Sequence, residues 1–191
     1  MYPALELVTG ALFALLFYKF QFVDSNLVFS EAILGMYALY AFYTFVLVFT
    51  FFFDLHYLKV SDEILIPAIL IGLIATIATP LTPHFIDALI GLGIGVAFFG
   101  LQSLVSRGKW VGLGDLRIGA FMGVILGWEL MLVALFISYM IGSAISIFIA
   151  IKQKKFYGVK VPFAPFLVTG TFLTIFLGDK ILNWYLGGMG L

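Results

Sequence analysis

The chain has 191 residues, of which 63% are hydrophobic and only 10% are charged. Soluble globular domains carry roughly 25% charged residues, so this composition is that of a chain whose main solvent is lipid. The formal net charge is zero and cysteine is absent. The charge gives no argument for a nucleic-acid partner, and the lack of cysteine excludes a disulfide framework, a zinc–thiolate site and a cysteine nucleophile.

Hydrophobic runs and their breaks predict an all-α fold, a polytopic membrane helix bundle of about seven helices, some of them short. The expected helices are residues 3–18, 27–53, 64–79, 86–105, 115–127, 129–151 and 164–187. Trp128, between the fifth and the sixth, indicates a turn at the membrane interface. Because no repeat or long soluble segment is visible, residues 1–191 are predicted to form a single membrane-embedded domain.

No cleavable signal peptide is expected at the start of the chain, because Lys19 follows the first apolar run instead of preceding it. Basic residues in the connecting segments predict the orientation of the bundle. If the helices alternate in direction, eight of the ten fall on one side: Lys59, Arg107, Lys109, Arg117, Lys152, Lys154, Lys155 and Lys160. The positive-inside rule then places segments 54–63, 106–114 and 152–163 in the cytoplasm, together with the N-terminus.

Several hydrolase chemistries lack their residues in this sequence. There is no HExxH or GxSxG motif, and the two histidines, His56 and His84, fall on opposite sides of the predicted topology, so they cannot share a metal ion. A dyad of Ser61 and His56 is a weak alternative, and both histidines are better interpreted as interfacial polar residues. No metal site and no cofactor are expected.

Two aspartates at the predicted cytoplasmic edge are more informative. Asp54 ends an apolar stretch, and Asp115 opens the fifth helix. Ionisable residues at such a depth usually have a partner or a function. Glycines recur after Asp115 at four-residue spacing, at Gly119, Gly123 and Gly127. Asp115 is therefore expected to point toward a packed neighbouring helix, and Phe121, which lies off this face, to contact lipid. The alternative is an aspartate that only complements the helix dipole.

Two facing carboxylates can hydrolyse a peptide bond. Their mutual repulsion leaves the pair holding one proton. The ionised member then activates water, while the protonated member polarises the scissile carbonyl and later protonates the leaving amine. Gly112 and Gly114, just before Asp115, allow a substrate backbone to approach without obstruction by a Cβ atom. A competing interpretation is an ion carrier or channel that uses its buried carboxylates as a relay.

Residues 112–115, Gly-Leu-Gly-Asp, match the GxGD motif of membrane aspartic peptidases, and residues 111–127 resemble the corresponding block of the type IV prepilin peptidases, with Arg117 at its basic position. Residues 53–67 resemble a second block of that family, with Asp62 eight residues after Asp54 and Pro67 in the next helix. Ser61 stands where the family usually has proline. Residues 2–10 and 161–166 resemble the family's second helix and the segment that opens its last helix.

The resemblance implies a prepilin peptidase of the cell membrane, multi-pass, with Asp54 and Asp115 as the catalytic pair and Gly112, Gly114 and Asp62 close to the substrate. Asp62 is interpreted first as a helix cap and second as a contact for the leader. The substrate would be a prepilin or pseudopilin whose basic leader is cut after a glycine at the cytoplasmic face. Longer relatives carry a cysteine-bearing segment linked to N-methylation, so methyl transfer by this chain is not expected. The oligomeric state stays open.

Overall fold

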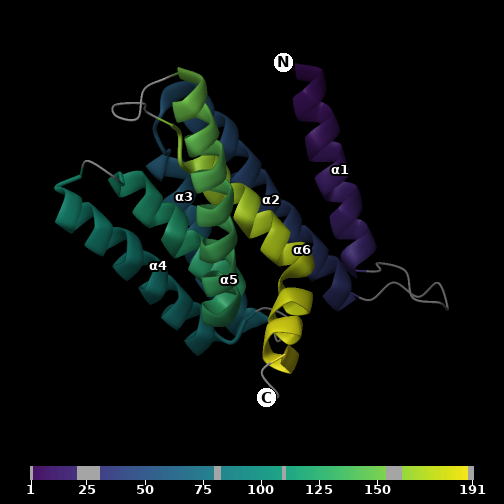
Figure 1. Ribbon diagram of the computed structural model, residues 1–191. Coiled ribbons are helices and arrows are strands. Elements are labelled where there is room, and N and C mark those ends of the chain that lie inside the picture. Colours follow the sequence, from purple (N-terminus) through teal and green to yellow (C-terminus); the bar gives the residue numbers. More distant parts are fainter. Residues whose placement is uncertain (1, 21–30, 80–82, 109–110, 154–160, 189–191) are drawn as a thin grey trace. The chain divides into compact units, whose positions relative to one another are not determined.

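The computed structural model describes residues 2–20, 31–79, 83–108, 111–153 and 161–188. These residues form six helices, drawn in Figure 1. The helices are α1 (Tyr2–Phe20), α2 (Glu31–Tyr57), α3 (Asp62–Ala78), α4 (Phe85–Ser106), α5 (Leu113–Gln153) and α6 (Ala164–Gly188). No strand occurs within these ranges, so the predicted all-α class is confirmed.

Four segments are long and apolar enough to cross a bilayer: 34–57, 85–106, 113–152 and 164–188. The chain is therefore a multi-pass membrane protein. Helix α3, with 17 residues, is among the short helices predicted from the sequence. By their packing the residues divide into two compact units, Met1–Phe49 and Thr50–Leu191. The prediction of a single domain stays a prediction.

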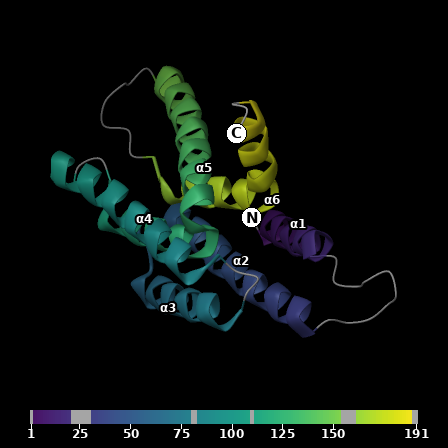
Figure 2. The same ribbon diagram turned by 90° about the horizontal axis from the view of Figure 1, so that it is seen from below.

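The unit Met1–Phe49 holds α1 and most of α2. Within it, the ring of Phe17 in α1 meets the ring of Tyr37 in α2 edge-on, with centroids 6.2 Å apart. The unit Thr50–Leu191 holds the end of α2 and all of α3 to α6. Both ribbon views show α5 between α4 and α6 (Figures 1 and 2), and α4 and α6 are its main packing partners.

Helix α5 consists of two helical segments joined at Gly127, whose φ of 73° and ψ of 177° are not helical. Glycine suits this position because other residues rarely adopt a positive φ. The predicted fifth and sixth helices are thus the two segments of α5, and the turn expected at Trp128 lies one residue earlier. Leu116, before Gly127, lies beside Gly100 of α4, and Tyr139, after Gly127, hydrogen-bonds Gln102 of α4, so the chain reverses direction at Gly127.

The glycine stripe of α5 packs against α4, as predicted. A Cβ atom on Gly91 of α4 would lie 2.5 Å from the carbonyl oxygen of Gly123, and one on Gly95 would overlap the backbone of Gly119. Partner numbers fall in α5 as they rise in α4, so the two segments run antiparallel. The glycines permit a backbone-to-backbone approach that side chains would prevent.

Phe121 corrects one expectation about this helix. Its side chain does not contact lipid but is completely buried. All residues from 118 to 127 are buried, because this segment of α5 has no lipid-facing side within its unit. A helix enclosed in this way is apolar all round, so its hydrophobic pattern does not distinguish a buried face from a lipid-facing one, although its glycines mark the face of closest packing.

The second segment of α5 packs antiparallel against α6. A Cβ on Gly170 of α6 would lie 2.8 Å from the carbonyl oxygen of Ala134, and one on Gly142 of α5 would lie 3.1 Å from the ring of Phe166. The buried hydroxyl of Ser138 donates to the carbonyl of Ala134 at 2.6 Å. Such bonds within a helix satisfy polar groups that have no water to bind in the membrane.

Candidate functional site

Asp54 lies in the last turns of α2 and is 7% exposed. Its Oδ2 accepts a hydrogen bond from the backbone N–H of Ala164, at 3.2 Å. Ala164 is the first residue of α6, and the first N–H groups of a helix have no partner within the helix. The Asp54 carboxylate therefore accepts a hydrogen bond from an N–H group that would otherwise be unpaired. That bond offsets part of the free energy lost when the carboxylate is buried.

Asp115 is the third residue of α5. Its Oδ2 accepts the backbone N–H of Gly112 at 3.1 Å, just before the helix begins. An acidic side chain in the first turn that reaches back to the residue preceding the helix is one half of a capping box. This bond fixes the orientation of the carboxyl group and uses one of its two oxygens.

The structure brings these two predicted aspartates together. The connection that follows α2 packs against the start of α5, where Val60 adjoins Gly114 and Asp62 pairs with Arg117, so the two aspartates lie at the same end of their unit and the charge of Asp54 acts on the carboxyl group of Asp115. Both residues belong to the unit Thr50–Leu191. Each carboxyl group is held by a backbone N–H at a helix N-terminus, which restrains it without using a second charged side chain.

The two glycines before Asp115 have different surroundings. A Cβ on Gly114 would lie 2.6 Å from Cγ2 of Val60, so a glycine is required there for the 58–61 connection to pack against α5. At Gly112 a Cβ would meet only an Asp115 oxygen, at 3.8 Å, and the backbone N of Gly114, at 3.9 Å, and the residue is exposed. Of the two, only Gly112 presents open backbone beside the aspartates.

Asp62 begins α3, and its carboxylate forms an ion pair with Arg117 of α5. The side chains are 45% and 34% exposed, respectively. Ser61 is the N-cap and makes no capping hydrogen bond through its side chain, while Asp62 adds an acidic group to the first turn. The cap predicted at Asp62 is therefore wrong by one residue, because Ser61 occupies the N-cap position. Asp62 complements the dipole of α3 from the first turn and, through Arg117, ties α3 to α5, which the sequence did not indicate.

Three contacts join the regions around segments 54–63, 106–114 and 152–163, which the distribution of basic residues placed on one side of the membrane. They are Asp54 with Ala164, Val60 with Gly114, and Asp62 with Arg117. The segments that follow α2, precede α5 and precede α6 therefore share one end of their unit. His56 is exposed there, and its Nδ1 is 2.9 Å from the carbonyl of Phe52 in its own helix. Across the described ranges, no three side chains of His, Asp or Glu gather into a possible metal site.

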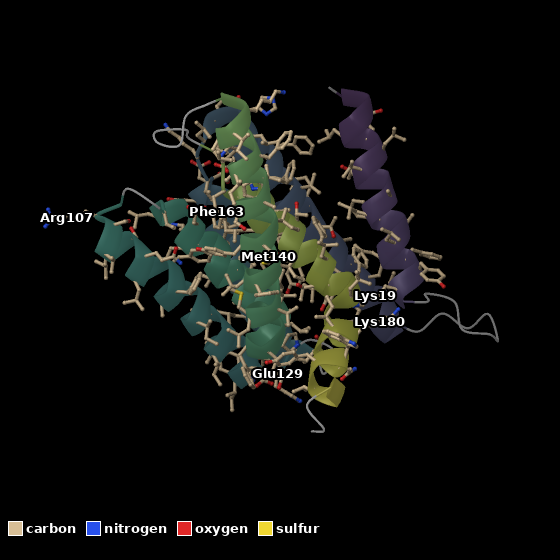
Figure 3. The ribbon with its side chains drawn as sticks, in the orientation of Figure 1. Lys19, Arg107, Glu129, Met140, Phe163 and Lys180 are labelled. Carbon is tan, nitrogen blue, oxygen red and sulfur yellow. The ribbon has the colours of Figure 1, made fainter. Side chains whose placement is uncertain are left out.

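Tyr139 and Gln102 belong to no motif and were not among the predicted site residues. The hydroxyl of Tyr139, in α5, donates to Oε1 of Gln102, in α4, at 2.8 Å. The Tyr139 ring meets Phe163 edge-on, with centroids 5.2 Å apart. Glu129 lies at the start of the second segment of α5, next to the turn at Gly127, and in Figure 3 Phe163 lies well above it. The sequence signal that could have indicated this contact is the presence of a tyrosine and a glutamine, two polar side chains, within membrane-spanning segments.

Residues 41–147, which include both aspartates, match the model of the type IV leader peptidase family. The chain belongs to this family. The leader peptidase family match spans α4 and most of α5 but ends before Ala164. No solved structure matches the chain.

Three relatives share the name prepilin leader peptidase/N-methyltransferase. The protein of Bacillus subtilis is 27% identical over 97% of this chain and 70% of its own length. The Aeromonas salmonicida protein is 27% identical over 75% of this chain and 50% of its own length. The Legionella pneumophila protein is 30% identical over 71% of this chain and 48% of its own length. The chain thus spans about half the length of two of these leader peptidase relatives.

Proposed function

We propose that the chain is an aspartic endopeptidase that removes the basic leader peptide from prepilin or pseudopilin substrates at the membrane. The observation that carries this proposal is that Asp54 of α2 and Asp115 of α5 lie at the same end of one helical unit, where the connection after α2 packs against the start of α5. Membership of the leader peptidase family and the names of the relatives support the substrate class.

In the proposed reaction the two aspartates share one proton. The ionised carboxylate takes a proton from a water molecule, whose oxygen attacks the scissile carbonyl carbon. The protonated carboxyl group polarises the carbonyl oxygen during the attack. The protonated carboxyl group then passes its proton to the leaving nitrogen, the C–N bond breaks, and the leader departs with a new carboxylate. The proton gained from water stays on the pair and restores its shared proton. The chemistry needs no cofactor.

The cytoplasmic face is the proposed location of the site, in a cytoplasmic membrane. The three segments that meet around Asp54 and Asp115 carry most of the basic residues of the chain, and cytoplasmic loops are rich in lysine and arginine. A basic leader that has not crossed the membrane would reach the aspartates from this side. The lipid bilayer is the second proposed partner, because large apolar side chains such as Phe136, Phe148 and Leu104 are exposed on the helices.

The experiment is cleavage of a purified prepilin by the purified chain in detergent or in bilayers, followed by mass spectrometry. The expected products are the leader and the shortened pilin, cut once. An intact prepilin after prolonged incubation with the folded wild-type chain, alongside a known leader peptidase that does cut it, would overturn the proposal.

A further inference from the structure

Among the first three residues of α6, Ala164 alone has an N–H group available to Asp54. It donates to Oδ2 of that aspartate at 3.2 Å. The next residue, Pro165, carries no N–H, and the N–H of Phe166 bonds the carbonyl of Phe163 at 3.0 Å. A displacement of α6 by one residue would bring proline to Asp54 and remove this hydrogen bond. The contact therefore depends on what holds the start of α6 in place.

Phe163, the residue before α6, anchors this point in two ways. Its carbonyl accepts the N–H groups of Phe166 and Leu167, so Phe163 is the N-cap of the helix. Its ring meets the ring of Tyr139 edge-on, with centroids 5.2 Å apart, and a Cβ on Gly142 would lie 3.6 Å from Cε2 of that ring. Tyr139 and Gly142 share one face of the second segment of α5. Phe163 thus caps α6 with its backbone and packs on α5 with its side chain.

The same ring reaches the start of α5 through α4. Phe163 and Phe99 of α4 meet edge-on, with ring centroids 6.3 Å apart. The Phe99 ring is completely buried and lies on Gly119 of α5, where a Cβ would overlap it. Gly119 is one turn after Asp115, on the same face of the helix. A continuous line of contacts therefore runs from the start of α6 to the helix turn that carries Asp115.

A purely structural role for Phe163 would be to fill space between α4, α5 and α6. Its side chain is only partly buried, however, whereas the rings that fill the interior, such as those of Phe99 and Phe121, are completely buried. Aromatic rings prefer definite mutual geometries. Edge-on contacts with rings of α4 and α5 therefore restrain where the backbone of Phe163 can lie, and with it the first N–H of α6.

We propose that Phe163 is a positioning residue whose ring keeps the N–H of Ala164 on Asp54. The contact through Phe99 would at the same time fix the place of Asp54 relative to Asp115, which is what leader cleavage requires. This inference rests on the proposed function. The two carboxyl groups come from separate helices, and a misplacement of about 1 Å at an active site can cost about 10²-fold in rate.

The test compares Phe163→Leu, Phe163→Met and Phe163→Tyr with the wild-type chain. Leucine and methionine are apolar and fill space but lack the ring, so the start of α6 should lose its restraint. The turnover number kcat for prepilin cleavage should then fall roughly 10- to 100-fold, with little change in KM. Tyrosine keeps the ring and should keep most of the wild-type kcat. Circular dichroism identifies the variants that fold, and kcat is measured on those.

Phe172→Leu is the matched control. Phe172 is also a partly exposed phenylalanine of α6, but it lies beyond the first turns of the helix. Its replacement should lower the thermal unfolding midpoint as a loss of packing does, and leave kcat unchanged. Wild-type kcat in Phe163→Leu or Phe163→Met would overturn the inference. Equal losses of kcat in Phe163→Leu and Phe172→Leu would also overturn it, as would a Phe163→Tyr variant as slow as Phe163→Leu.

An NMR measurement tests the inference without the peptidase activity. In a chain made with isotope-labelled alanine, the amide signal of Ala164 is identified by its loss in Ala164→Gly and should move in Asp54→Asn. Its hydrogen should exchange with solvent faster in Phe163→Leu than in the wild-type chain, but not in Phe172→Leu. Unchanged exchange in Phe163→Leu overturns the role of Phe163 even if the wild-type chain cleaves prepilin. Faster exchange in a chain that cleaves nothing would sink the proposed function and leave the positioning of Ala164 by Phe163 standing.

Discussion

Asp54 binds the backbone N–H of Ala164, a residue 110 positions later in the chain. The bond connects the last turns of α2 with the first residue of α6, while Asp115 at the start of α5 is restrained by its own preceding glycine. Two carboxyl groups that are far apart in the sequence thus lie in one region, formed by the end of α2 and the starts of α5 and α6.

Replacing either aspartate by asparagine should abolish leader cleavage. Asp54→Asn and Asp115→Asn are nearly isosteric, and each removes a group that takes up or releases a proton, so a loss of roughly 10²–10⁴-fold in rate is expected. Mass spectrometry of the prepilin measures the rate, and circular dichroism checks that the helices persist. Asp62→Asn is the control and should do less, since Asp62 pairs with Arg117 and is 45% exposed. A dead Asp62→Asn beside an active Asp54→Asn would show that the wrong carboxylate has been assigned.

Leucine at the α4–α5 contact should destabilise the protein. Gly91→Leu or Gly123→Leu would drive a side chain into the opposing backbone, and overpacking typically costs about 1–3 kcal/mol. Gly93→Leu is the matched control, because Gly93 is exposed and a Cβ there would meet nothing within 4 Å. Thermal unfolding in detergent measures the difference, and equal midpoints for Gly91→Leu and Gly93→Leu would refute the packing.

Alanine at Gly127 should destabilise α5 at its turn. Gly127 has a φ of 73°, and a Cβ there would lie 3.2 Å from Cβ of Pro83. The strain of a non-glycine residue in such a conformation is about 1–3 kcal/mol. Gly93→Ala, in regular helix, serves as the comparison and should be neutral or stabilising. The free energies of unfolding of the two variants would be compared in one detergent, and the prediction fails if they agree.

The ion pair of Asp62 and Arg117 should contribute little to stability. Both side chains are partly exposed, so water screens their attraction, and about 0.2–1 kcal/mol of coupling is expected. A double-mutant cycle with Asp62→Asn and Arg117→Gln measures this coupling, which should shrink as salt is added. A coupling of several kcal/mol that salt does not affect would mean that the pair is buried in the working protein.

Leader cleavage should survive chelation. Two carboxyl groups that share a proton need no metal ion, so the rate with EDTA should equal the rate without it. A parallel assay with a zinc-dependent peptidase shows that the chelator is effective. Loss of cleavage that returns when a divalent cation is added back would contradict the aspartic mechanism.

Much of the architecture follows from the sequence by simple physics. Apolar runs long enough to cross a bilayer must become helices, because a lipid environment leaves no other partner for backbone N–H and C=O groups. Gly119 and Gly123 recur with the period of a helix, so the sequence alone predicts which face of that helix packs closely. The grouping of Asp54 with Asp115 followed from their place at the same ends of alternating helices.

Other relationships depended on the tertiary structure. The partner of Asp54 is a backbone N–H, which every residue except proline carries, so no pattern of side chains identifies Ala164. Tyr139 and Gln102 lie on different helices, and their contact depends on how far α5 returns after Gly127. The lipid contact expected for Phe121 is wrong because periodicity reveals a buried face only when another face is exposed, and residues 118–127 are buried on every side. The sequence determined which segments are helices and where the carboxyl groups lie along them; the packing of those helices decided what each carboxyl group touches.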